Sequence, residues 1–243
     1  LTTGIVAPQL NRSQPIRNDE KRTERWRDNN IGQLTDEAKS KDPLEARVHG
    51  HPYLDVINQG QMDATGKDLS CTALFTDEVS GLNHDVSMRD VEISYPYPNT
   101  LAVLEITGAD LRTAIEQCAH YWQWDGSTVH VSTDYTDPKV QHYNYDLFAG
   151  IDYTIDVNKP LDARVTHLTY HDHTVKNTDR LHIVLNQYRA IGGGEFHMFS
   201  AEKIIKEIPV DMTELIARYF ASHRIVTPEQ NGHYQVVANG NPL

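Results

Sequence analysis

Apolar residues recur at helical spacing in three long segments, and we predict helices over residues 52–66, 107–122 and 211–223. The first segment opens with a proline, which suits the first position of a helix. The second opens with a Thr-x-x-Asp capping box, and its apolar stripe continues to Trp122. The third begins with an aspartate N-cap, for which Glu214 is the expected capping-box partner.

Shorter patterns predict the remaining elements. A Ser-x-x-Asp capping box at residues 87–90 indicates the start of a short helix, and residues 200–208 are also predicted to be helical. Runs rich in β-branched and apolar residues, bounded by turn residues, are typical of strands. These runs cover residues 69–75, 101–106, 129–133, 151–157, 165–170 and 181–186.

The order of these elements indicates the fold class. Strands and helices are mixed along the chain without a regular βαβ alternation, and no internal repeat is found. We therefore predict an α+β fold in which a mixed β-sheet is packed with helices.

The first 45 residues differ from the rest of the chain. Residues 18–30 are dense in charged side chains, and residues 33–43 are again polar. We interpret residues 1–45 as an interdomain linker or arm, with a floppy tail of the same domain as an equal alternative. Residues 46–243 are expected to form the globular domain. The start at Leu1 lacks the features of a signal peptide and fits a processed protein or an excised piece.

Composition limits the function classes. The 34 acidic and 22 basic residues give a net charge of −12, which disfavours a nucleic-acid polymer as a partner but allows one small anion to bind locally. No run approaches the ~20 apolar residues of a membrane span. Cys71 and Cys118 lie in apolar patterns, so we favour buried free thiols over a disulfide.

Familiar catalytic and metal-binding motifs are missing. The sequence has no GxGxxG after a strand, no GxxxxGK[ST], no GxSxG, no HExxH and no CxxC. Two close histidine pairs occur, His49 with His51 and His171 with His173. A metal site needs three or four converging ligands, so we favour solvated side chains and keep a metal site at either pair as the weaker alternative.

Residues 93–101 form the first segment that suits ligand binding. Pro96 and Pro98 bracket Tyr97 and restrict the backbone on both sides of it. A ring held in this way loses little entropy when a ligand stacks on it. A buried tyrosine in a proline-rich turn is the favoured alternative for this segment taken alone.

Residues 184–196 form the second such segment, in which a predicted strand runs into a polar, aromatic and cationic cluster. Glycine lets the backbone approach a ligand closely or adopt positive φ, although a plain glycine-rich turn is an equal alternative. Taken together, the two segments suggest that two aromatic rings clamp a flat ligand, while amide and guanidinium groups read its edges. The candidate residues of the second segment are Asn186, Gln187, Tyr188, Arg189, Gly192, Gly193 and Gly194.

The ordered set of short motifs resembles a known family. The chain over residues 52–199 is similar to the C-terminal domain of the 5'-nucleotidase family, and most similar to its 2',3'-cyclic-nucleotide 2'-phosphodiesterase/3'-nucleotidase branch. Tyr97 favours this branch, because the 5'-nucleotidase branch carries Phe at that position. The matching stretches are residues 52–59, 88–91, 95–101, 105–111, 143–146, 150–156 and 186–194.

The resemblance implies a division of labour. In the family, an N-terminal metallophosphoesterase domain holds two divalent metal ions and a catalytic His/Asp pair, and the C-terminal domain stacks the nucleobase between two aromatic residues. Those residues correspond to Tyr97 and Tyr188, and the glycine run lies near the ribose. The metal domain is absent from this chain, so we expect no cofactor, no catalytic residue and no activity of this chain alone. We also expect an extracytoplasmic location, either secreted, periplasmic or attached to the cell wall.

The sequence departs from the family pattern in two places. Residues 73–79 lack the nucleoside-binding Asn and Arg of the 5'-nucleotidase branch, and Gly194 replaces an Asp. Three alternatives therefore stay open beside a nucleotide-binding substrate domain. They are a non-catalytic interaction module that buries both tyrosines, a 5'-nucleotidase-type substrate domain, and an enzyme that uses the turn around His171.

Overall fold

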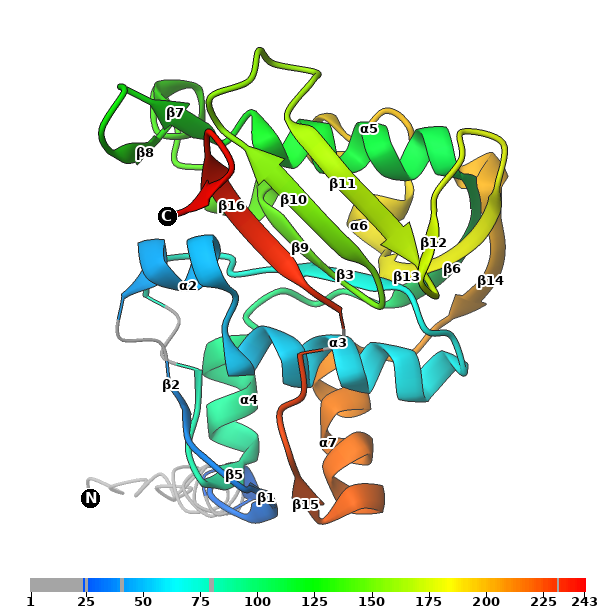
Figure 1. The fold of residues 1–243 in the computed structure, drawn as a ribbon. Helices are drawn as coiled ribbons and strands as arrows, with labels where there is room; N and C mark the ends of the chain where they lie inside the picture. Colours follow the sequence, from blue (N-terminus) through cyan, green and yellow to red (C-terminus); the bar gives the residue numbers. More distant parts are fainter. Residues whose placement is uncertain (1–23, 25, 40–41, 79–80, 231) are drawn as a thin grey trace, which may run out of the picture.

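The computed structural model describes residues 24, 26–39, 42–78, 81–230 and 232–243, and it has an α+β fold (Figure 1). A mixed five-stranded central sheet has the order β14-β6-β13-β3-β9. Strand β13 runs parallel to β3 and antiparallel to β6, and β9 runs antiparallel to β3. The fold class predicted from the sequence is confirmed. In sheet order the strands are Ile204–Ile208, Leu101–Thr107, Arg180–Asn186, Ser70–Ala73 and Asp146–Ala149.

A second five-stranded sheet lies beside the central one. Its C-terminal strand β16 pairs in parallel with β10, although the two are far apart in the sequence, and Figure 1 shows them side by side. In sheet order the strands are β12 (His173–Thr174), β11 (Val165–Tyr170), β10 (Asp152–Asp156), β16 (Tyr234–Ala238) and β17 (Asn241–Pro242).

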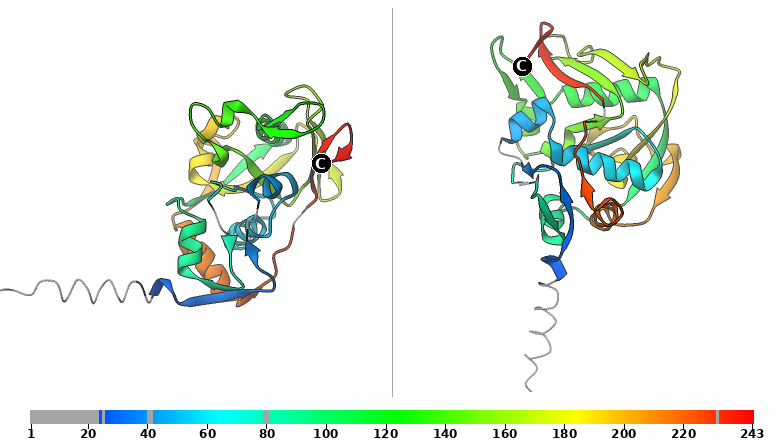
Figure 2. Two further views of the ribbon diagram at one scale, coloured as in Figure 1. Left: turned by 90° about the vertical axis from the view of Figure 1, so that its left-hand side faces the viewer. Right: turned by 60° about the horizontal axis from the view of Figure 1, so that its bottom comes forward.

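Three small sheets complete the strands. The first joins β15 (Ile225–Val226), β1 (Asn30–Leu34) and β5 (Asp85–Ser87). The second pairs β2 (Ala38–Lys39) with β4 (Gly81–Leu82), and the third pairs β7 (Trp122–Trp124) with β8 (Val129–Val131). Both views in Figure 2 keep β1, α4 and α7 together at the end of the molecule away from the second sheet.

The helices cover both sides of the central sheet. Helix α3 packs on β3 and β13 and contacts α7, whereas α5 packs against β6 and β11 and so joins the two sheets. The α-helices are α2 (Pro43–His49), α3 (Pro52–Thr65), α4 (Met88–Ser94), α5 (Gly108–Ala119), α6 (Gln187–Ala190) and α7 (Met212–His223). The 3₁₀ turns are η1 (Thr133–Tyr135), η2 (His142–Asn144), η3 (Gly193–Glu195) and η4 (Ala201–Lys203).

The predicted helix signals largely hold in the structure. Both capping boxes form, at the starts of α4 and α5, and α3 stops at Gly66, which adopts a left-handed φ of 67°. Asp211 caps α7 by accepting from the Thr213 N–H. Glu214, however, accepts from Arg218 at 2.6 Å instead of returning to the cap as expected.

Two predictions of element type or extent are also wrong. Helix α5 ends at Ala119, and Trp122, expected on its apolar stripe, starts β7 and is 1% exposed. The indole N–H of Trp122 donates to the Tyr145 hydroxyl at 3.0 Å, so the side chain is buried with its donor satisfied. Residues 204–208 form edge strand β14 and not a helix, because the isoleucine-rich run pairs with the open edge of β6.

Part of the segment expected to be a connecting arm belongs to the folded unit. Strand β1 pairs with β5 and β15, and Leu34 and Ala38 are fully buried. Just before β1, the carboxylate of Asp28 accepts from Arg89 of α4 at 2.7 Å. Residues 1–23 of the expected arm lie outside the described residues.

Two further expectations concern thiols and the membrane. Cys71 and Cys118 are both buried and free, as predicted. Within the described ranges, the helices are too short or too polar to cross a lipid bilayer.

Candidate functional site

One end of the central sheet gathers four chain segments that are distant in sequence. Strands β6 and β13 are antiparallel with Leu101 opposite Asn186, so the segment that enters β6 and the segment that leaves β13 emerge together. Strand β3 runs parallel to β13 and ends on the same side. Ala73 of β3 lies opposite Asp146, so β9 begins there too. Strand register therefore brings the two segments that the sequence singled out, residues 93–101 and 184–196, to the same end of the sheet.

A hollow of about 370 Å³ opens at this end of the central sheet. The side chains of Tyr97 and Tyr188 both line it and are 39% and 45% exposed, respectively. Neither ring is a core residue, contrary to the alternative that buries both. The full lining is Phe75, Tyr97, Pro98, Asn99, Lys139, Tyr143, Asn186, Tyr188 and Arg189.

Tyr97 is held by the loop between α4 and β6 and by an aromatic neighbour. The Phe75 ring meets the Tyr97 ring edge to face, with centroids 5.2 Å apart and planes at 86°. The Asn99 N–H donates to the Tyr97 carbonyl at 2.8 Å, and the Asn99 carbonyl accepts from the Met212 N–H at the start of α7. The loop is thus tied to a helix terminus, which limits the freedom of the ring.

Tyr188 lies on the short helix α6, which Asn186 caps by accepting from the Arg189 N–H at 2.9 Å. The glycine run packs directly against the tyrosine. A Cβ atom at Gly193 would lie 2.5 Å from the Tyr188 carbonyl and 2.7 Å from its ring. At Gly194, with φ of 71°, it would fall on the Asn144 amide. Gly193 therefore lets the backbone pack on the Tyr188 ring, and Gly194 lets the same turn pack on Asn144.

The two tyrosine-bearing segments are also bonded to each other. The Gln187 N–H donates to the Thr100 carbonyl at 2.9 Å, and the Thr100 hydroxyl donates to the Gln187 amide oxygen at 2.7 Å. The Gln187 amide nitrogen donates to Glu207 at 3.3 Å. The side chain of Gln187, which the sequence suggested for reading a ligand edge, instead joins the two loops.

Arg189 is 2% exposed and lies under the hollow. Burial disfavours its charged form, but the Asp146 carboxylate outweighs this and raises the pKa of Arg189 above its ordinary value. The guanidinium carbon lies 3.9 Å from the centroid of the Phe196 ring. Because every N–H of the guanidinium has a partner, Arg189 braces the loops. Its acceptors are both Asp146 oxygens (2.7 and 3.1 Å), the carbonyls of Tyr143 (2.8 Å) and Gly193 (2.5 Å), and the Asn144 amide oxygen (3.5 Å).

Comparison with known proteins places this architecture in a family. The profile of the 5'-nucleotidase C-terminal domain matches residues 9–201. The chain belongs to the 5'-nucleotidase C-terminal domain family. The family resemblance stated from the sequence is thereby confirmed.

Characterised relatives and solved structures agree with this assignment. The trifunctional nucleotide phosphoesterase YfkN of Bacillus subtilis is 23% identical over 63% of this chain and 11% of its own length. A 2',3'-cyclic-nucleotide 2'-phosphodiesterase/3'-nucleotidase of Haemophilus influenzae is 27% identical over 64% of this chain and 25% of its own. A candidate 5'-nucleotidase from Staphylococcus aureus, solved with alpha-ketoglutarate, superposes with a TM-score of 0.85 at 34% identity.

This 5'-nucleotidase C-terminal domain spans only part of those proteins. The superposition covers 96% of this chain but 45% of the Staphylococcus aureus structure. The sequence matches cover a quarter or less of the two curated relatives. The similarity therefore concerns this domain and not the rest of those chains.

Sequence reasoning missed four residues that line the hollow of this 5'-nucleotidase C-terminal domain. Tyr143 lies in a stretch that supported the family resemblance, and Phe75 ends a predicted strand, so both had a signal. Asn99 belongs to the proline-rich loop itself. Lys139 lies in a polar segment with no recognisable pattern, and its ammonium is 5.5 Å from the centroid of the Tyr143 ring.

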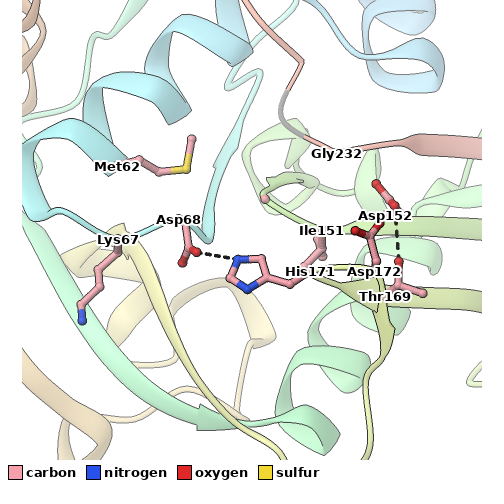
Figure 3. A pocket seen from close by; sticks show the side chains of 10 residues that line it. Met62, Lys67, Asp68, Ile151, Asp152, Thr169, His171, Asp172 and Gly232 are labelled. Atoms are coloured by element: carbon pink, nitrogen blue, oxygen red, sulfur yellow. Dashed lines mark hydrogen bonds and ion pairs between the residues drawn. The ribbon is translucent and has the colours of Figure 1, made fainter.

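A second hollow, of about 500 Å³, lies at the opposite end of the β3–β9 pair (Figure 3). The Nε2–H of His171 donates to the Asp68 carboxylate at 2.7 Å, and the Tyr170 hydroxyl donates to the same carboxylate at 2.7 Å. Partial burial opposes ionisation of Asp68, but the bonds from Tyr170 and His171 prevail and lower its pKa. Among the charged groups that line this hollow, Asp68 is thus already paired with His171.

The histidine pairs of the sequence do not converge on a metal site. The Nε2 atom of His51 bonds the Lys39 carbonyl at 2.8 Å, while Nδ1 accepts from the Tyr53 N–H and caps α3. His49 pairs with Glu45 at 3.1 Å. Across the described ranges, no group of three or more His, Cys, Asp or Glu residues is arranged to hold a metal ion.

Proposed function

We propose that this chain is the nucleotide-binding, substrate-specificity domain of a 2',3'-cyclic-nucleotide 2'-phosphodiesterase/3'-nucleotidase. In this proposal Tyr97 and Tyr188 stack on the two faces of the nucleobase. One observation carries it: two half-exposed tyrosine rings from distant segments line a single hollow. The family match and the names of the curated relatives support the substrate class.

Stacking supplies enough free energy for a substrate-binding site. Each base–aromatic contact contributes about 1–3 kcal/mol and tolerates every base, because every base has a π-face. Phe75 behind one ring and Gly193 behind the other restrict both tyrosines before the ligand arrives. Pre-restricted side chains lose less entropy on binding. We therefore expect broad base specificity.

Polar groups around the rings would orient the nucleoside. The Asn186 amide oxygen is used as an N-cap, while its amide nitrogen has no partner within the described residues and is available to an acceptor on the base or ribose. The backbone at Gly192, Gly193 and Gly194 carries no side chain that would keep a ribose away. Arg189 would act by holding Asn144 and Gly193 in place.

The chemical step is proposed to take place elsewhere. Two divalent metal ions would belong to a separate metallophosphoesterase domain of the same protein, as the family membership implies. Such ions lower the pKa of water and stabilise phosphoryl-transfer charge. This chain would contribute binding and orientation and would not hydrolyse a nucleotide alone. We further propose a location outside the cytoplasm, which fractionation of the native cells would test.

The test is a calorimetric titration of adenosine and 3'-AMP into the wild type and into Tyr97→Ala and Tyr188→Ala. We expect each substitution to weaken binding by about 5- to 150-fold, equivalent to about 1–3 kcal/mol. Tyr170→Ala is the matched control, because this ring stacks on His171 beside the other hollow, and it should leave both affinities unchanged. Undiminished binding by both clamp variants would rule out the site. No binding by the folded wild type at millimolar ligand would favour a non-catalytic interaction module.

One observation favours a second candidate. The Staphylococcus aureus structure, at 34% identity, is described as a 5'-nucleotidase. A substrate domain of that type would use the same hollow for a 5'-nucleotide. Titrating 5'-AMP beside 3'-AMP separates the two, because the proposed function requires the tighter affinity for 3'-AMP.

A further inference from the structure

The charge around the hollow differs from that of the chain as a whole. The chain carries a net charge of −12, yet the lining of the hollow includes two cations, Lys139 and Arg189, and no carboxylate. A site with local positive charge suits a small anion even in an acidic chain. Water and salt screen distant charges, so the cations nearest the anion dominate its electrostatic energy.

The two cations are not equivalent. The guanidinium of Arg189 is buried and forms a pair with Asp146, and all its N–H groups are engaged. Lys139 is exposed, and within the described residues its ammonium forms no ion pair or hydrogen bond. The ammonium instead lies over the face of the Tyr143 ring, 5.5 Å from its centroid. Lys139 is thus the cation of the lining with free donors.

We propose that Lys139 binds the phosphate of a nucleotide whose base lies between Tyr97 and Tyr188. This inference rests on the proposed function and adds to it the residue that distinguishes a nucleotide from a nucleoside. The ammonium has three donors on a flexible four-carbon stem, so it can reach a phosphate oxygen without a fixed geometry. The Tyr143 ring keeps the stem at the hollow before binding.

The arrangement separates the recognition of the two halves of a nucleotide. Both aromatic faces suit the uncharged base, which gains little from a cation. A phosphate carries its charge on oxygens that accept strong, charge-assisted hydrogen bonds. Removing the ammonium should therefore lower the affinity for a ligand that carries a phosphate and leave the affinity for the nucleoside unchanged.

The experiment compares adenosine with 3'-AMP by calorimetry in four proteins. They are the wild type, Lys139→Gln, Lys139→Arg and the control Lys159→Gln, an exposed lysine in the turn after β10 that does not line the hollow. We expect wild type to bind 3'-AMP about 5- to 20-fold more tightly than adenosine. Lys139→Gln should abolish this ratio without changing adenosine affinity. Lys139→Arg and Lys159→Gln should keep the ratio, and added salt should lower it in wild type.

The outcomes separate this inference from the proposed function. If Lys139→Gln binds adenosine normally and keeps the preference for 3'-AMP, Lys139 does not bind the phosphate, while the tyrosine clamp stands. If Lys139→Gln weakens adenosine and 3'-AMP equally, the role is structural and the inference fails. If the folded wild type binds neither ligand, the clamp and the lysine contact both fail.

Discussion

The two hollows of the molecule lie at opposite ends of the same pair of strands, β3 and β9, and they differ in how their polar groups are used. The larger hollow is lined by Lys67, Asp68 and His171 among others, and the carboxylate of Asp68 already accepts hydrogen bonds from His171 and Tyr170. The smaller hollow exposes two tyrosine rings and one cation, Lys139, that forms no ion pair or hydrogen bond among the described residues. Size alone would therefore select the wrong hollow for the proposed function.

The difference reflects where the supporting contacts lie. At the smaller hollow the buried pair of Arg189 with Asp146 lies beneath the surface and holds the loops from inside. At the larger hollow the pair of His171 with Asp68 lies at the surface, with both side chains more than half exposed. Preorganised binding sites need support that solvent cannot replace. Among the described residues, the buried pair of Arg189 with Asp146 gives the smaller hollow that support.

Breaking each pair should give the largest contrast in stability. Arg189→Met leaves the Asp146 charge buried without its partner, and we expect the free energy of unfolding to fall by about 3–5 kcal/mol. Asp68→Asn removes an exposed contact and should change it by about 1 kcal/mol or less. Urea denaturation of both variants measures the difference. Equal losses in the two variants would show that Arg189 does not brace the fold in the way its contacts indicate.

Displacing the Tyr188 ring should lower the free energy of unfolding by less than Arg189→Met does, but it should also weaken ligand binding. Gly193→Ala places a Cβ atom 2.7 Å from the Tyr188 ring, so the ring must shift. We expect a loss of about 1–3 kcal/mol in unfolding free energy from this overpacking, and at least about fivefold weaker adenosine binding from partial loss of stacking.

The control for that variant lies at the other hollow. Thr169→Ala removes a 3.3 Å hydrogen bond to Asp152 and should leave adenosine affinity unchanged. Normal adenosine affinity in folded Gly193→Ala would mean that the position of Tyr188 does not determine binding.

The starts of helices could be predicted where the side chains at those positions form a capping box. The capping boxes of α4 and α5 each need only four residues, and both form. Residues 204–208 were misassigned because strand β14 exists through its pairing with β6, which is a non-local contact. The strands β1 and β2 were missed for the same reason, since their small sheets depend on distant two- or three-residue partners.

The candidate site was predictable in its aromatic residues and not in its support. The composition of two loops and a family resemblance indicated Tyr97 and Tyr188. Their convergence depends on the register that sets Leu101 opposite Asn186, which the alternation of side chains within one strand cannot reveal. Arg189 was expected to offer donors to a ligand. Its partner Asp146 lies on β9, a strand that the sequence did not indicate.

Acidity should also affect the end of the β3–β9 pair that carries the smaller hollow. Burial, assisted by the Arg47 charge, lowers the pKa of His142 below 6.5, although Asp77 opposes this. The unfolded chain then binds more protons than the folded chain below about pH 6.5, so stability should fall as pH decreases through that value. His142→Gln should remove this part of the pH dependence.

Thr169→Ala, which removes a side chain without a titratable group at the other hollow, is the comparison for this pH dependence. Both variants would be unfolded with urea between about pH 5 and 8, a range that spans the ordinary histidine pKa. We expect the curve of stability against pH to flatten in His142→Gln only. An unchanged slope in that variant would show that another group causes the acid sensitivity.

The smallest expected effect concerns the hydroxyl groups of the clamp itself. Stacking uses the ring faces, and both rings are half exposed, so their hydroxyls are not required to bind a base. Tyr97→Phe and Tyr188→Phe should therefore keep adenosine affinity within about twofold of wild type, equivalent to about 0.4 kcal/mol. A loss as large as that of the alanine variants would mean that the hollow recognises its ligand through hydroxyl hydrogen bonds. The contrast between the two hollows would then rest on polar contacts at both ends, and stacking would no longer distinguish the smaller one.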